Sequence, residues 1–160
     1  MLSYYVKRSK NEGFVKTKVF HEYTTWIHGD AVSQHELDEL VKIHKLQPNI
    51  LRDVRDKNEL PHIEYGNDGT VYAFLRVPMI REDHEVTTTP LLLVLTKSRY
   101  FTLAYGSTFS PDETIRRLDI DHISRPTHLA LLTVAQIVSE YELLMQKTTQ
   151  AIKDVRRRLR

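Results

Sequence analysis

Two carboxylates three residues apart, Asp53 and Asp56, have the residue type and spacing that could hold a metal ion. They lie on a segment expected to be helical, where residues three apart reach the same face. Magnesium and other hard cations take carboxylate oxygens and keep several waters, so one or two carboxylates can suffice. However, Arg52, Arg55 and Lys57 crowd the same segment. The spacing alone therefore favours a solvated, salt-bridged surface over a metal site.

Other chemistry finds little support in the sequence. None of the eight His residues forms a pair with the spacing of a metal-binding helix. Gly106-Ser107 lacks the flanking glycine of a nucleophile elbow. Gly66-Asn67-Asp68-Gly69 has the composition of a hairpin turn rather than a phosphate-binding loop. The chain has no Cys, which excludes thiol nucleophiles and thiolate zinc sites. We expect no enzyme.

The charge and hydropathy of the chain indicate which classes of partner it is expected to bind. The formal net charge is +2, which neither requires nor excludes nucleic acid. Arg156-Arg157-Arg158 is basic but has no interleaved aromatic residues, so no nucleic-acid partner is expected. The longest apolar run, Leu91 to Leu95, is far shorter than the roughly 20 residues of a membrane span. As given, the chain is expected to be soluble and cytoplasmic.

The chain's 160 residues suffice for one domain with a real core. Turn signals and short apolar runs predict three strands in the first thirty residues. Ser33 and Glu36 have capping-box spacing and predict a helix start, and Pro48 suits the first turn of a second helix. Two hairpins follow, over residues 61–78 and 87–105, and then a short helix. The non-alternating run from Leu91 predicts a strand covered on both faces.

From about Pro126 one long helix is expected. Its apolar residues recur in alternating steps of three and four, a heptad seam broken only by Thr148: Leu131, Val134, Val138, Tyr141, Met145, Thr148, Ile152, Val155 and Leu159. Ala130, Ile137, Leu144 and Ala151 widen this stripe on one side. Whether the first half of the seam faces the core is left open. The second half outruns a small domain, so we expect it to project and to self-associate through Ile152, Val155 and Leu159.

Several stretches resemble the cytoplasmic domain of CorA-type magnesium transporters. They are Trp26-Ile27-His28, Gln47 to Val54, Leu60 to Tyr65, Val71 to Arg76, Pro90 to Lys97 and Tyr100 to Leu103. The order and spacing of this set agree over roughly Trp26 to Leu159. The resemblance implies an α/β fold: an α/β/α sandwich with a central mixed, largely antiparallel sheet and a long C-terminal helix. We divide the chain into an α/β domain, 1–125, and a helix leading toward a stalk, 126–160.

The resemblance also implies a site. The family's helix reads Pro-x-x-Leu-Glu-Asp, and its Asp helps to bind a regulatory magnesium ion between subunits. The matching stretch here is Pro48 to Asp53, which assigns Asp53 to half of a metal site. Arg52 stands where the family has Glu, and a guanidinium group repels a neighbouring cation. Magnesium is therefore expected to bind the isolated chain weakly or not at all.

The function implied is that of a cytoplasmic regulatory domain of a CorA-like divalent metal ion transporter, contributing to ion sensing and gating. In that family the domain lies below a membrane pore in a homopentamer, followed by a stalk helix and two membrane helices with a Gly-Met-Asn signature. The chain ends before these segments, so we expect a soluble fragment from the cytoplasmic side of the membrane. The alternative is a stand-alone cytosolic interaction module that dimerises through its C-terminal helix.

Overall fold

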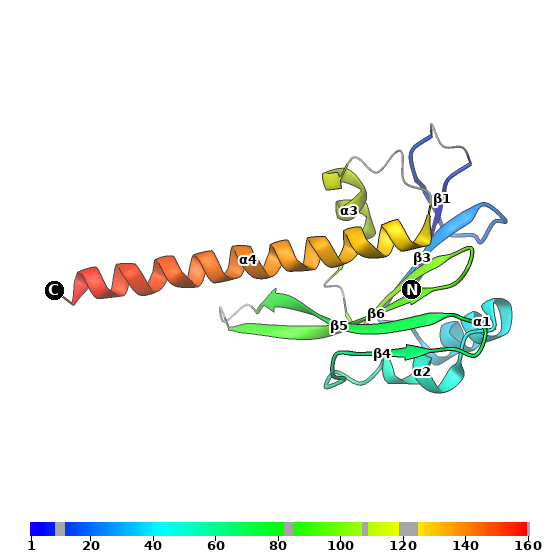
Figure 1. Ribbon diagram of the computed structural model, residues 1–160, viewed down its shortest axis with the longest axis horizontal. Coiled ribbons are helices and arrows are strands. Elements are labelled where there is room, and N and C mark those ends of the chain that lie inside the picture. The colour runs from blue at the N-terminus through cyan, green and yellow to red at the C-terminus, as the bar shows by residue number, and fades with distance from the viewer. Residues whose placement is uncertain (9–11, 82–84, 107–108, 119–124, 160) are drawn as a thin grey trace.

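The computed structural model describes residues 1–8, 12–81, 85–106, 109–118 and 125–159, which form a sheet with helices on both faces (Figure 1). Along the chain the elements follow the expected order of three strands, two helices, four strands, a short helix and a long helix. Their bounds are β1 Leu2–Val6, β2 Val15–Thr17, β3 Thr24–Asp30, α1 Gln34–His44, α2 Pro48–Asp53, β4 His62–Tyr65, β5 Val71–Ile80, β6 Val86–Leu95, β7 Tyr100–Ala104, α3 Pro111–Leu118 and α4 Pro126–Arg158.

The sheet is mixed and largely antiparallel, as expected. Its strands lie in the order β2-β1-β3-β7-β6-β5-β4. Strands β3 and β7 run parallel, with Trp26 opposite Tyr100, and the other neighbouring pairs among the described strands are antiparallel. Strand β6 lies inside the sheet, and its Leu91–Val94 stretch is buried on both faces. This confirms the reading of its continuous apolar run.

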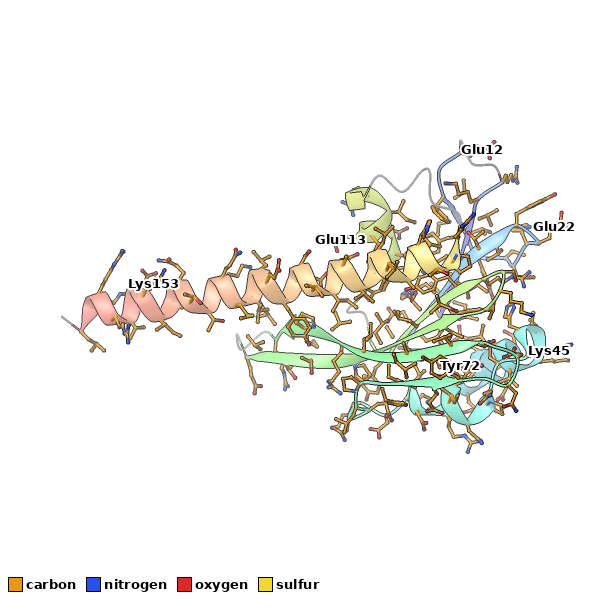
Figure 2. All side chains as sticks on the ribbon, viewed as in Figure 1. Glu12, Glu22, Lys45, Tyr72, Glu113 and Lys153 are labelled. Atoms are coloured by element: carbon orange, nitrogen blue, oxygen red, sulfur yellow. The ribbon has the colours of Figure 1, made fainter. Side chains whose placement is uncertain are left out.

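Helices α1 and α2 cover one face of the sheet. Their apolar residues pack with Tyr72, Phe74 and others in one core cluster. The predicted capping box is present: the Ser33 hydroxyl accepts the Glu36 N–H, and the Glu36 carboxylate accepts the Ser33 N–H at 2.9 Å. At the start of α2, the Tyr72 hydroxyl accepts the Gln47 N–H at 2.9 Å. Figure 2 shows Tyr72 on the side of the sheet that faces these helices.

Helix α4 lies across the other face, with α3 beside it (Figure 1). Trp26 is fully buried in the core of this face, in ring contact with Tyr5 and Tyr100. The Trp26 indole N–H donates to the Thr102 hydroxyl at 2.9 Å. The Tyr100 hydroxyl donates to Thr133 of α4 at 2.8 Å. These bonds satisfy the polar atoms of large buried side chains and fix the helix against the sheet.

The orientation of α4 answers the question that the sequence left open. The residues buried against the sheet are Leu129, Ala130, Thr133, Gln136 and Ile137. The seam is largely exposed even in the first half, where Leu131 is 64% exposed and Val138 50%. The flanking stripe therefore packs on the sheet, and most of the heptad seam faces away from the core, although Tyr141 of the seam packs against it.

Helix α4 has 33 residues, so it is about 50 Å long, and its C-terminal half extends past the sheet (Figure 1). This confirms that the second half projects. Within the described part of the chain, no helix has the length and apolar content needed to span a membrane. Helix α4 begins at Pro126, but the division into units 1–125 and 126–160 stays a prediction.

Candidate functional site

Asp53 is the last residue of α2 and faces outward. Pro48 occupies the first turn, where its missing N–H is not needed. Ile50, Leu51 and Val54 are buried and anchor this short helix on the core. Since these three positions point inward, Asp53 is presented to solvent with Arg52 next to it, and both are exposed. The exposed position is compatible with a carboxylate that meets an ion from outside the chain.

Asp56 does not lie free beside Asp53. Its carboxylate accepts the N–H of Asn58 at 2.8 Å, and its own N–H donates to the carbonyl of Asp53 at 2.9 Å. Asp56 therefore shapes the turn that follows α2. Among the residues that the structure describes, no group of three or more His, Asp or Glu side chains is arranged to hold a metal ion. Asp53 as half of a metal site stays a prediction.

Two arginines flank the candidate carboxylate, and they differ in how they are held. Arg55 donates from Nη1 to the side-chain oxygen of Gln34 on α1 at 3.2 Å. This contact ties the turn after α2 to the neighbouring helix. Arg52 is exposed and adjoins Asp53 in the chain. Its positive charge would oppose the binding of a cation at Asp53, and water screening would moderate that effect.

Sequence reasoning missed Arg76, which connects this region to the sheet and to α4. Its guanidinium group donates to the carbonyls of Lys57 at 3.2 Å and Glu59 at 2.7 Å, beyond α2. It also donates to the hydroxyl and the carbonyl of Thr88 on β6, both at 2.6 Å. From α4, the Tyr141 hydroxyl donates to the Arg76 carbonyl at 3.2 Å. One residue thus touches the segment after Asp53, the hairpin and the long helix.

A second polar region lies at the carboxyl end of β3, where an open hollow of about 390 Å³ is bounded by β1, β3 and the start of α3. His28 and Asp30 line it, as do Lys16 and Asp112, which form an ion pair at 2.6 Å. Burial lowers the pKa of His28 to about 4, although the Asp30 and Asp112 carboxylates favour the charged form. His28 is therefore neutral at physiological pH.

Thr102 links the ring of His28 to the core. The Thr102 hydroxyl accepts from Trp26 and lies 2.9 Å from Nδ1 of His28. Because Thr102 is fully buried, these contacts hold the His28 ring against the core. The hollow is therefore lined by a neutral imidazole held by the core.

Comparison with known proteins adds the family. A model of the family described as CorA-like Mg²⁺ transporter protein matches residues 21–160. The chain belongs to this family. The resemblance predicted from the sequence is confirmed, and the family is one of transporters, not of enzymes. No curated protein sequence gives a significant match to the chain.

Solved structures show the same fold at low sequence identity. The soluble domain of CorA from Methanocaldococcus jannaschii has a TM-score of 0.75 at 18% identity over 99% of this chain. The complete CorA magnesium transporter from that organism gives 0.76 at 16% over 99%. The cytoplasmic domain of ZntB from Vibrio parahaemolyticus gives 0.71 at 8% over 95%. The predicted α/β/α sandwich is thereby confirmed.

The chain is shorter than these relatives. It spans 64% of the M. jannaschii soluble-domain chain, 51% of the complete transporter and 63% of the ZntB domain. The matches thus establish a family and a fold for the described region. The transport activity, ions and assembly of a whole protein are a separate question.

Proposed function

We propose that this chain is the cytoplasmic regulatory part of a CorA-like divalent metal ion transporter, contributing to ion sensing and gating. The family match over residues 21–160 carries the proposal. The similarity to soluble and cytoplasmic domains supports a place on the cytoplasmic side of the membrane. Membrane attachment would come through segments that this chain does not contain, as the complete transporter of similar fold suggests.

The proposed assembly is a homopentamer in which Asp53 supplies one of the carboxylates for a magnesium ion between subunits. Its exposed position at the end of α2 leaves it accessible to a neighbouring subunit. A cation held between two negatively charged surfaces relieves their repulsion and favours the state in which they are close. Loss of the ion would then favour a state with the subunits further apart.

The hydrogen bonds of Arg76 could couple ion binding at Asp53 to the position of helix α4. The segment after Asp53 accepts hydrogen bonds from the Arg76 guanidinium group, and the Tyr141 hydroxyl of α4 donates to the Arg76 carbonyl. A displacement of α2 would therefore shift Arg76, and with it the part of α4 around Tyr141, beyond which the helix projects past the sheet. In a whole transporter, that helix would carry the displacement toward the membrane.

A transport assay tests this proposal. Residues 1–160 replace the matching region of the M. jannaschii CorA transporter, and the chimera is placed in liposomes with a fluorescent magnesium indicator. We expect magnesium entry to fall several-fold as the magnesium concentration on the domain's side rises to millimolar levels. Asp53→Ala should weaken this dependence, while Asp38→Ala, an exposed carboxylate on α1, should keep it. Entry that does not respond to magnesium on the domain's side would contradict a regulatory role.

A further inference from the structure

An open hollow of about 270 Å³ lies where α1 ends against two turns of the sheet. Its lining comes from the last residues of α1, the turn between β4 and β5, and the turn between β6 and β7. Figure 2 labels Lys45, the residue that ends α1, at the end of the molecule opposite the projecting tip of α4. Neither Asp53 nor Arg76 lines this hollow, so it is distinct from the candidate metal site.

Three cationic side chains, Lys45, Lys97 and Arg99, line this basic hollow. None of them forms an ion pair with another residue that the structure describes. The Asp68 carboxylate also lines the hollow, but it accepts the N–H and the hydroxyl of Thr70 in its own turn. The end of α1 contributes about half a negative charge, so the hollow keeps a net charge of about +1.5. An anion is therefore the ligand that its electrostatics favour.

Arg99 is held by an aromatic ring and keeps a donor that the fold does not use. Its guanidinium group lies 5.1 Å from the centre of the Phe20 ring. Its buried Nε–H has no hydrogen-bond acceptor among the described residues. The ring of His44 contacts both Phe20 and Phe101, so aromatic side chains support the guanidinium group and the hollow beside it. An arginine placed in this way next to lysines matches the donors that bind phosphate groups.

We propose that the basic hollow binds a soluble phosphate-bearing ion, held by Lys45, Lys97 and Arg99. A phosphate group carries about −1.5 to −2 charges at neutral pH and several acceptor oxygens, which suits donors that come from different elements. Ser98, which also lines the hollow, adds a hydroxyl group. Because the cations surround a hollow between a helix end and two turns, the site fits a small ion better than a membrane surface.

Titration of the chain with inorganic pyrophosphate tests the site, followed by NMR in magnesium-free buffer of constant ionic strength. We expect saturable shifts of the amide signals of residues 96–99, with a dissociation constant of about 0.1 mM. Lys97→Ala and Lys45→Gln should each weaken binding about fivefold, since each removes one positive charge from the hollow. Lys42→Gln is the matched control, because Lys42 is exposed on the same helix and does not line the hollow. Unsaturable shifts, or equal weakening by Lys42→Gln and Lys45→Gln, would overturn the proposal.

Asp68 and His44 supply two further measurements with a defined sign. Asp68→Asn should tighten pyrophosphate binding about threefold, since the carboxylate repels an anion, and Asn can still accept the Thr70 N–H. Burial, and next the charge of Arg99, lower the pKa of His44 to about 4. Saturating pyrophosphate should raise this pKa by about one unit, because an anion offsets the charge of Arg99. Weaker binding by Asp68→Asn, or an unchanged pKa of His44, would overturn the proposal.

Vesicles distinguish a soluble ion from a lipid headgroup. The chain is sedimented with phosphatidylcholine vesicles that contain or lack phosphatidic acid, whose headgroup is a phosphate monoester. We expect phosphatidic acid to leave the bound fraction unchanged in Lys45→Gln and Lys97→Ala relative to the parent chain. Vesicle binding that both variants abolish, without binding of pyrophosphate, would overturn the assignment to a soluble ion. None of these measurements involves ion transport, so this inference and the proposed function can fail separately.

Discussion

At the scale of single residues, Arg76 holds together parts of the molecule that are distant in sequence. Its four side-chain bonds go to two carbonyls of the segment after α2 and to both oxygens of Thr88. The planar guanidinium group presents several donors in fixed directions, and a lysine ammonium group cannot reproduce that geometry. Arg76 is thus a joint between the candidate site and the sheet.

We predict that Arg76→Ala lowers the free energy of unfolding by about 3 kcal/mol, since it leaves partly buried carbonyls without donors. Arg76→Lys should recover less than half of the loss. Arg81→Ala is the control, because Arg81 pairs with Glu85 at 3.5 Å on an exposed surface, where such a pair contributes under about 1 kcal/mol. Urea unfolding measures all three variants. If Arg76→Ala and Arg81→Ala lower the free energy of unfolding equally, the hydrogen bonds of Arg76 stabilise the fold no more than an exposed ion pair does.

His28 gives the fold a dependence on pH. Burial lowers its pKa to about 4 in the folded chain, whereas an exposed histidine titrates near 6.5. Between these values the unfolded state binds more protons, so stability should fall as the pH drops from about 6.5 to 4. The loss from His28 is about 3 kcal/mol, because each unit of pKa difference is worth about 1.4 kcal/mol. Burial also lowers the pKa of His44 to about 4, which acts in the same direction.

The effect of His28 can be isolated by Asn, whose uncharged side chain can keep a hydrogen bond to the Thr102 hydroxyl. His28→Asn should flatten the fall in stability between pH 6.5 and 4, measured by urea unfolding at several pH values. NMR titration of the imidazole protons gives the pKa directly. A His28 that titrates near 6.5 in the folded chain would contradict the assignment.

At the scale of elements, sequence patterns predicted local structure better than orientation. The capping box at Ser33 and Glu36 and the proline at the start of α2 are local signals, and both were confirmed. Sequence analysis did not predict the contacts of Arg76, because its partners lie 12 to 19 residues away and three of them are main-chain carbonyls. Nothing in the composition of β5 marks such a contact.

Helix α4 shows the same limit. Its period predicted a long helix, yet the seam from Leu131 and the stripe through Ala130 and Ile137 are similarly apolar. Contacts with the sheet decide which of the two faces packs inward, because the Tyr100 hydroxyl donates to Thr133 of α4. The stripe with small and polar residues therefore packs inward, and most of the regular heptad seam, Tyr141 excepted, stays outside. Most residues of the seam are therefore exposed to solvent instead of packed in the core.

At the scale of the whole molecule, the proposed metal site at Asp53 would depend on the proposed assembly of subunits. Asp53 is exposed and has no other acidic or histidine side chains arranged around an ion within the described ranges. Asp56, the nearest carboxylate in sequence, already caps its own turn. One carboxylate beside Arg52 would bind a cation weakly, so the proposed site would need further ligand groups, which the proposed assembly would supply from another subunit.

We therefore predict that millimolar magnesium changes the melting temperature of this chain by little, even though the family transports the ion. At a magnesium concentration equal to the dissociation constant, one site adds only about 0.4 kcal/mol of stability. Thermal unfolding from zero to about 10 mM magnesium, with Asp53→Ala as the comparison, measures the effect, and matched ionic strength removes general screening. A large saturable shift that Asp53→Ala abolishes would mean that the chain carries a complete site. In that case Arg52 would not be the obstacle that its charge suggests, and ion sensing would not need the assembly.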